Sequence, residues 1–212
     1  AQISGNMTVS GQVVEVVEPE EDDWCPDSNG TATITSFEGP QAGSGCSFFN
    51  DCNNTALHLI IQNASIPANA FYECSDIETV QLDSSVTSIP DGAFRDMWYL
   101  RSVTGGNITS MGDYSFFKAE RLSSINLEGV QQIGERCFQQ MGRHVVSQLG
   151  LSMSPIASST VTSIGAHAFY LSEIESVEFP NLQTVNDGIF QGCSSLENVS
   201  LPAVTSIGMT GF

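Results

Sequence analysis

The residue types that catalyse reactions or hold metals are few in this sequence, and their spacing does not assemble a reactive site. The three histidines, His58, His144 and His167, have no second His or Cys at a spacing typical of metal ligands. No nucleophile elbow, phosphate-binding loop or paired-carboxylate motif occurs. The run D-S-N-G at 27–30 resembles the start of a calcium loop, but the distal Glu is not at the required spacing. We therefore expect no enzymatic activity, no metal and no cofactor.

Asparagines in the acceptor pattern N-x-S/T are the residues whose chemistry is best indicated. Six such sequons account for half of the Asn residues: Asn6, Asn29, Asn53, Asn63, Asn107 and Asn198. One interpretation is coincidence in a chain rich in Ser and Thr. The other is an N-glycosylated extracellular protein, with the modified side chains in solvent. We favour the second and expect Asn107 and Asn198 to be the best acceptors within the repeats.

A repeated phrase must position these residues. An aliphatic residue followed five positions later by Phe recurs with Phe-to-Phe spacings of 23, 22, 22, 31, 21 and 22 residues. The pairs are Ile66/Phe71, Ile89/Phe94, Met111/Phe116, Ile133/Phe138, Ile164/Phe169, Val185/Phe190 and Ile207/Phe212. A period of 20–29 residues is that of leucine-rich repeats, in which stacked units bury a continuous core that one unit cannot.

Each repeat has three parts. A strand phrase such as L-E-N-V-S-L (196–201) comes first, and a shorter extended phrase such as V-T-S-I (161–164) follows. The third part is a turn carrying the Phe, as in G-I-F-Q-G-C (188–193). We expect the Phe side chains to form one buried column along the stack, because a fully buried Phe stabilises a core by about 1.5–3 kcal/mol.

The pattern resembles the BspA-like, or Treponema pallidum-type, leucine-rich repeats. The phrases that carry the resemblance are V-T-S-I-G-A-H-A-F (161–169), I-P-A-N-A-F-Y-E-C-S-D-I (66–77) and I-F-Q-G-C-S-S-L-E-N-V-S-L-P-A-V-T-S-I-G (189–208). The resemblance covers about residues 57–212. It implies a β-rich solenoid of about seven repeats of about 22 residues. It also implies a cell-surface or adhesive protein that binds other proteins, and it implies no reaction.

Charge and hydropathy narrow the partners. The formal net charge is −18, from 24 acidic residues against six Lys and Arg. Such a surface repels phosphate backbones, so nucleic acid is a poor partner, as is an anionic membrane surface. No apolar run reaches the length of a membrane span, so we expect no membrane insertion. The charge is interpreted as a source of solubility, with weak binding of divalent cations as the alternative.

The first 56 residues depart from the repeat and are predicted to form an amino-terminal β cap ahead of the solenoid at 57–212. Residues 3–17 alternate apolar and polar side chains, as a strand does, and an acidic linker, E-P-E-E-D-D, covers 18–23. T-A-T-I-T-S-F (31–37) is predicted to be another strand. A cap is expected because the terminal repeat of a solenoid exposes its core.

Cysteines support this cap. Cys25, Cys46 and Cys52 lie within it, and Cys74 follows in the first repeat. We expect one disulfide among the first three and a second completed by Cys74, with the pairing left open. Cys137 and Cys193 are expected to be small buried side chains. Two repeats separate them, and at about 4.8 Å per strand that distance exceeds the roughly 7 Å limit for a disulfide.

The repeat that follows Phe138 is longer by nine residues. We assign its strand phrase to V-S-Q-L-G-L (146–151) and the extra residues to 152–160. Insertions in solenoids emerge as loops, often on the binding face. A tolerated loop without function is the alternative.

Two functions fit these features. In the first, the chain is a structural subunit that assembles head to tail into a fibre. The last repeat would present Leu201, Val204, Ile207 and Phe212, and the first strand phrase of the next copy, with Ile3, Met7, Val9 and Val13, would cover them. The dull alternative to this contact is a longer chain whose further part holds the cap. In the second function, the chain is a monomeric adhesin that binds a protein or glycan through exposed aromatics such as Trp98 and Tyr99.

Overall fold

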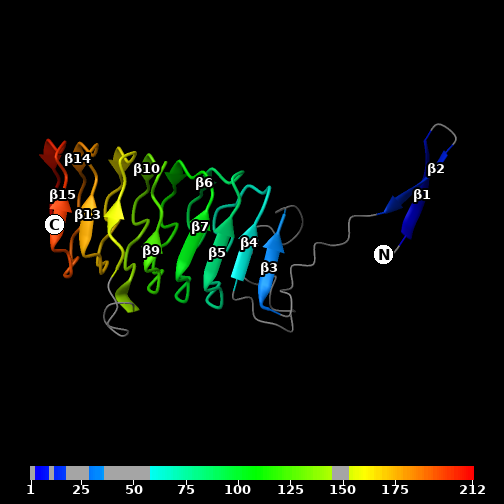
Figure 1. Ribbon diagram of the computed structural model, residues 1–212, viewed down its shortest axis with the longest axis horizontal. Helices are drawn as coiled ribbons and strands as arrows, with labels where there is room; N and C mark the ends of the chain where they lie inside the picture. Colours follow the sequence, from blue (N-terminus) through cyan, green and yellow to red (C-terminus); the bar gives the residue numbers. More distant parts are fainter. Residues whose placement is uncertain (1–2, 10–11, 18–28, 36–57, 145–152) are drawn as a thin grey trace.

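The computed structural model describes residues 3–9, 12–17, 29–35, 58–144 and 153–212, the first two ranges as backbone only. The amino-terminal segment predicted as a strand is an antiparallel hairpin of β1 (Ile3–Val9) and β2 (Gln12–Val17). The described residues from 29 onward form a solenoid, in which each turn of the chain stacks on the one before it (Figure 1).

The strand phrases form parallel sheets along one side of the stack. Residues 22 or 23 apart are direct partners in the register, as in Val80 with Val103. Alternate side chains point into the core, which gives the buried–exposed alternation along β5. The five-stranded sheet contains β3 (Thr31–Ile34), β4 (His58–Ile61), β5 (Thr79–Leu82), β7 (Ser102–Gly105) and β9 (Ser124–Ile125). The three-stranded sheet contains β11 (Ile156–Ala157), β13 (Ser176–Glu178) and β15 (Asn198–Ser200).

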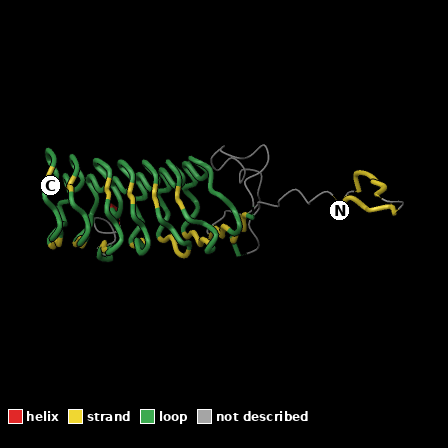
Figure 2. The backbone as a smooth tube through the Cα atoms, turned by 90° about the horizontal axis from the view of Figure 1, so that it is seen from above, coloured by secondary structure: helices red, strands yellow, loops and turns green. Residues whose placement is uncertain are grey.

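The V-T-S-I phrases form a second set of short parallel strands, and Figure 2 shows strands recurring at matching places in successive turns. Four of these strands pair in one sheet and two in another. They are β6 (Ser88–Ile89), β8 (Ser110–Met111), β10 (Gln132–Ile133) and β12 (Ser163–Ile164), then β14 (Thr184–Val185) and β16 (Ser206–Ile207).

The predicted phenylalanine column is confirmed. Neighbouring rings from Phe71 to Phe212 stack with centroids 5.3–5.8 Å apart. All members from Phe71 to Phe190 are buried, together with the aliphatic residue five positions before each one. We use "layer" for one repeat and name it by its Phe. The column is the central part of the core, because each ring covers a face of the next.

The turns around each Phe are held by hydrogen bonds between layers. The backbone N–H of Phe94 donates to Ser115 O at 2.8 Å, and that of Phe116 donates to Cys137 O at 2.9 Å. To aim these groups along the stack, the residues two before and two after the Phe take positive φ, as Tyr114 (56°) and Lys118 (57°) do. A left-handed residue other than Gly costs about 1–2 kcal/mol, which the inter-layer hydrogen bonds offset.

The glycine that follows the aliphatic mark is required by a close approach, since its φ is not positive. A Cβ on Gly134 would lie 2.5–2.6 Å from the backbone of Gly112 and Asp113 and from the Asp113 carboxylate. That carboxylate accepts the Glu135 N–H at 2.7 Å, which ties one layer to the next. In the Phe190 layer Asn186 replaces this glycine, and its side-chain amide donates to Ile164 O at 2.7 Å.

The assignment of the long repeat was wrong in part. Residues 146–151 lie outside the described residues. Met153 and Ile156 of the supposed insertion are buried, and β11 pairs in parallel with β13. These two residues, with Ser158, therefore fill the slots of Leu122, Ile125 and Leu127 in the layer before. Ser158 disguised the pattern because it is polar, and it satisfies its hydroxyl by donating to Leu127 O at 3.0 Å.

The boundary predicted at residue 56 remains a prediction. β3, which lies inside the predicted cap, is hydrogen-bonded to β4 as a further strand of the solenoid sheet. Its register continues that of the repeats, with Ala32 opposite Leu59 and Ile34 opposite Ile61. All four of these side chains are buried, so the core continues into β3.

Candidate binding surfaces

The three histidines lie in different layers, and each has a single local partner. His58 Nδ1 lies 2.8 Å from Thr79 Oγ1, and His144 Nδ1 lies 2.7 Å from Glu120 Oε2. The His167 ring packs edge-on against a neighbouring Tyr ring at 5.7 Å. Within the described residues no group of three or more His, Cys, Asp or Glu could hold a metal ion. The histidines therefore act as ordinary surface residues of their layers.

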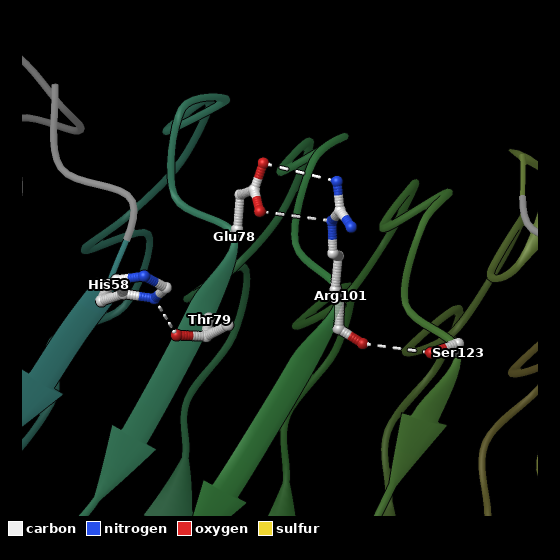
Figure 3. A network of polar contacts seen from close by, with 5 residues as sticks. All are labelled: His58, Glu78, Thr79, Arg101 and Ser123. Atoms are coloured by element: carbon white, nitrogen blue, oxygen red, sulfur yellow. Dashed lines mark hydrogen bonds and ion pairs between the residues drawn. The ribbon is translucent and has the colours of Figure 1, made fainter. Parts of the chain in front are cut away.

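A polar network crosses the five-stranded sheet at the start of its strands (Figure 3). Glu78 and Arg101 form an ion pair through two oxygen–nitrogen contacts of 3.3 and 3.5 Å. The backbone oxygen of Arg101 lies 3.5 Å from Ser123 Oγ in the following layer. The only cation in this network is already paired, so this edge has little capacity left to bind a charged ligand.

Carboxylates along the other strand set serve the fold. A shallow groove of about 620 Å³ follows β6, β8, β10 and β12 and includes Asp91, Asp113 and Glu135 in its lining. The Asp91 carboxylate accepts the Asp113 N–H at 2.8 Å, and Asp113 in turn accepts the Glu135 N–H. Asp187 repeats this bond to Met209 N near the end of the stack. These acids link layers, and we assign them no ligand.

The cysteines of the solenoid are of two kinds. Cys74 is buried and disulfide-bonded, and Cys137 and Cys193 are free thiols. Burial raises the pKa of both free thiols to about 12, so neither is a reactive thiolate at neutral pH. Cys25, Cys46 and Cys52 lie outside the described residues, and the pairing within the cap stays a prediction.

Four of the six sequon asparagines have described side chains, and all four are exposed: Asn29, Asn63, Asn107 and Asn198. Asn107 Nδ2 donates to Ser84 O at 2.8 Å, a bond that a glycosylated amide could keep with its remaining N–H. Asn198 lies on β15, where every residue is exposed. Asn6 lies on β1, and Asn53 is outside the described residues.

The last layer exposes apolar side chains that occupy core slots elsewhere. Ile207 is 60% exposed and Phe212 is 54% exposed, whereas Leu201 and Val204 are partly buried against the layer before. Val199 and Met209 are also exposed here, and the sequence analysis did not single them out. Ile3, Met7, Val9 and Val13 lie on the hairpin strands β1 and β2. No contact between the two groups is described, so their pairing stays a prediction.

The turn side carries aromatic–cation contacts that the sequence analysis missed. The Arg95 guanidinium lies 5.3–5.6 Å from the ring centroids of Tyr72, Tyr114 and Phe117, which belong to the layers on either side. Arg121 lies closer still to Tyr99, at 4.3 Å. Distances in this range fit cation–π attraction. Spacings of about 22 residues contain the signal, but it emerges only after the layers are aligned.

Among the described residues, no helix has the length and apolar character needed to cross a bilayer. Stacked parallel strands, one Phe per layer and a surface of local polar pairs define a leucine-rich repeat solenoid. A family model described as the BspA type leucine rich repeat region, with six copies, matches residues 44–156 and 151–212. The chain therefore belongs to the BspA-type leucine-rich repeat family, which confirms the resemblance seen in its repeats.

Solved structures agree with this fold. The leucine-rich repeat protein of T. pallidum is similar with a TM-score of 0.65 and 21% identity, over 90% of this chain and 85% of that one. A leucine-rich repeat protein from Bacteroides ovatus has 17% identity and a TM-score of 0.38, over 96% and 69% of the two chains. The identities show the fold alone, and the second TM-score carries no argument. No curated protein matches the sequence.

Proposed function

We propose that this chain is a non-enzymatic, extracellular, N-glycosylated leucine-rich repeat protein that acts through protein–protein contacts, and that its copies assemble head to tail into a fibre. The observation that carries the proposal is the apolar surface of the Phe212 layer. Its core-type side chains, Ile207 and Phe212, are more than half exposed. Apolar side chains in contiguous exposed groups mark interaction sites.

The edge of this layer is suited to strand addition. β15 pairs with β13, and β16 pairs with β14, and within the described residues neither has a partner on its other side. An extended segment with alternating apolar side chains would satisfy the free N–H and C=O groups and cover the core slots. The segment 3–17 of another copy has that alternation. A contact between opposite ends does not close on itself, so it propagates as a fibre.

Light scattering on the full chain tests this assembly. We expect a mass above that of one chain, and a return to one chain after deletion of residues 1–17 or after Ile207→Glu. Thr205→Glu is the matched control, because Thr205 is exposed in the same layer. If the full chain and both altered forms are all stable monomers, the fibre is wrong. The same proteins in negative stain should show fibres for the wild type and for Thr205→Glu only.

A longer natural form of the chain is a competing explanation of the open layer. A further repeat would cover Ile207 and Phe212 in the same way that the Phe212 layer covers Val185 and Phe190. Native protein should therefore be measured alongside the 212-residue chain. A monomeric native protein of greater mass per chain would replace the fibre with an ordinary internal layer.

The extracellular assignment rests on the exposed sequons. Four sequon side chains are exposed, and Asn107 and Asn198 lie in repeats whose folding does not depend on burying them. Intact mass of protein from its native source, before and after glycosidase treatment, should fall by whole glycan units. Asn107→Gln and Asn198→Gln should each remove one unit. An unchanged mass contradicts glycosylation in a host that performs the modification.

A monomeric adhesin is the second candidate, and one observation favours it. Trp98 and Tyr99 are 47% and 42% exposed, far from the open layer in the stack. Large exposed aromatics at a turn are common anchors for a binding partner. Discrete particles in negative stain, together with saturable binding of a ligand, would favour this function over the fibre.

A further inference from the structure

The positive charge of this chain is confined to a small part of it. All six Lys and Arg residues lie between positions 95 and 143, although the chain carries 24 acidic residues and a net charge of −18. In the solenoid these positions fall in the Phe94, Phe116 and Phe138 layers. One band of the solenoid therefore collects every permanent cation, and the rest of the chain repels anionic partners.

Within this band, cations and exposed aromatics occupy equivalent positions in successive layers. Tyr99, Arg121 and Arg143 each lie five residues after the Phe of their layer. The Arg121 guanidinium lies over the Tyr99 ring at 4.3 Å. The indole of Trp98 is exposed beside Tyr99. We call these four residues the Trp98 patch.

The charge of Arg121 is available to a partner. It makes no ion pair with any described residue, in contrast to Arg101, which is paired with Glu78. The nearest carboxylate along the chain, Glu120, is engaged by His144. Stacking on Tyr99 fixes the guanidinium plane, and the guanidinium has five N–H donors in a geometry that matches a carboxylate.

We propose that the Trp98 patch binds an acidic segment of a partner polypeptide in which carboxylate and apolar side chains alternate. Arg121 pairs with a carboxylate, and the Trp98 indole receives an apolar side chain. Trp, Tyr and Arg are the residues most enriched where single side chains dominate binding. The negative charge elsewhere on the chain restricts an acidic partner to this band and so sets its position.

A sulfated glycan is the other anionic macromolecule to weigh, and the surroundings of the patch disfavour it. Glu78 and Glu120 lie in the same band and would oppose a polymer that is negative along its whole length. An indole exposed to nearly half of its surface also contributes most when it covers an apolar group. Alternating acidic and apolar side chains match both properties.

Fluorescence anisotropy with a labelled peptide of alternating Glu and Leu tests the proposal on the full chain. We expect saturable binding that weakens as salt is raised, because exposed charges are screened. Arg121→Gln and Trp98→Ala should each weaken binding by about tenfold or more. Two matched controls should bind as the wild type does: Arg101→Gln, which removes a paired cation, and Tyr170→Ala, which removes a turn aromatic outside the patch. Circular dichroism melts verify that all four variants fold.

Several results would overturn the inference. They are an absence of saturable binding, equal binding by folded Arg121→Gln and wild type, and equal binding of a peptide with Gln in place of Glu. Patch-dependent binding of heparin without binding of the peptide would assign the patch to a glycan. Patch-dependent self-association without peptide would assign it to a second copy. The fibre proposal fails or stands separately, because Ile207→Glu should leave peptide binding unchanged.

Discussion

The interior layers and the Phe212 layer carry the same residues in the same slots, yet their environments differ. Ile164 is fully buried, and its counterpart Ile207 is 60% exposed. Phe116 is fully buried, and Phe212 is 54% exposed although it stacks on Phe190 at 5.4 Å. The backbone conformation is also shared, since Thr210 has the positive φ found at Tyr114.

The difference shows which part of a repeat's stability is its own. The turn and the strand pairs form against one neighbour, and burial requires two. A side chain in the last layer therefore has the local structure of a core residue and about half of its contacts. This is the nearest-neighbour behaviour expected of stacked repeats, in which interfaces between layers add to a smaller intrinsic term.

The largest expected effect is at the centre of the column. Phe116→Ala removes a ring packed between Phe94 and Phe138 at 5.3 Å on both sides. The change should cost about 3–5 kcal/mol of unfolding free energy, as a cavity in a core does. Urea denaturation of the variant and the wild type measures it. A loss below about 1 kcal/mol would show that the column is not the core of the interior layers.

A smaller effect is expected where one layer approaches the backbone of the next. Gly134→Ala would place a methyl group 2.5–2.6 Å from atoms of the Phe116 layer, so the layers must separate. We expect a loss of about 1–3 kcal/mol, the usual cost of overpacking. Gly208→Ala in the last layer is the matched comparison, and it should cost less because that layer can move. Equal losses in urea denaturation would contradict this freedom.

Most of the solenoid was predictable because each layer repeats the same slots. Phe94, Phe116 and Phe169 announce their burial through a constant offset from an aliphatic residue. The long repeat broke that regularity. V-S-Q-L-G-L imitates the strand phrase, whereas the true strand carries Pro155 before Ile156 and Ser158 in an apolar slot. Hydrophobic pattern does not register a hydroxyl that the layer before satisfies.

The candidate binding surfaces were less predictable, for a different reason. Trp98 and Tyr99 stood out by type, but the partner of Tyr99 is Arg121, which is 22 residues away. Such a pair is visible only once the register of the layers is known. The exposed Met209 occupies a turn position whose counterparts in other layers carry no common residue type. Nothing in its local sequence separates it from them.

Truncation of the last ring should have a modest effect on a single chain. Phe212→Ala removes one stacking contact from a side chain that already lies half in solvent. We expect a loss of about 1 kcal/mol or less, the worth of one aromatic pair. Urea denaturation at a concentration where the chain is monomeric measures it. A loss equal to that of Phe116→Ala would mean that another copy covers Phe212 in solution.

The smallest effect concerns a carboxylate that links two layers near the start of the stack. Hydrogen bonds from the Ser85 hydroxyl and the Asn63 N–H lower the pKa of Asp83. The position at the same place in the Phe212 layer is Pro202, which has no such group. Because the folded pKa is below the unfolded one, this stabilisation is present above about pH 4 and is lost as the pH falls through the folded pKa. Asp83→Asn should therefore melt slightly below the wild type at pH 7, and the two melting temperatures should converge in acid. A difference that stays constant from neutral to acid pH would show that the Asp83 charge does not link the layers.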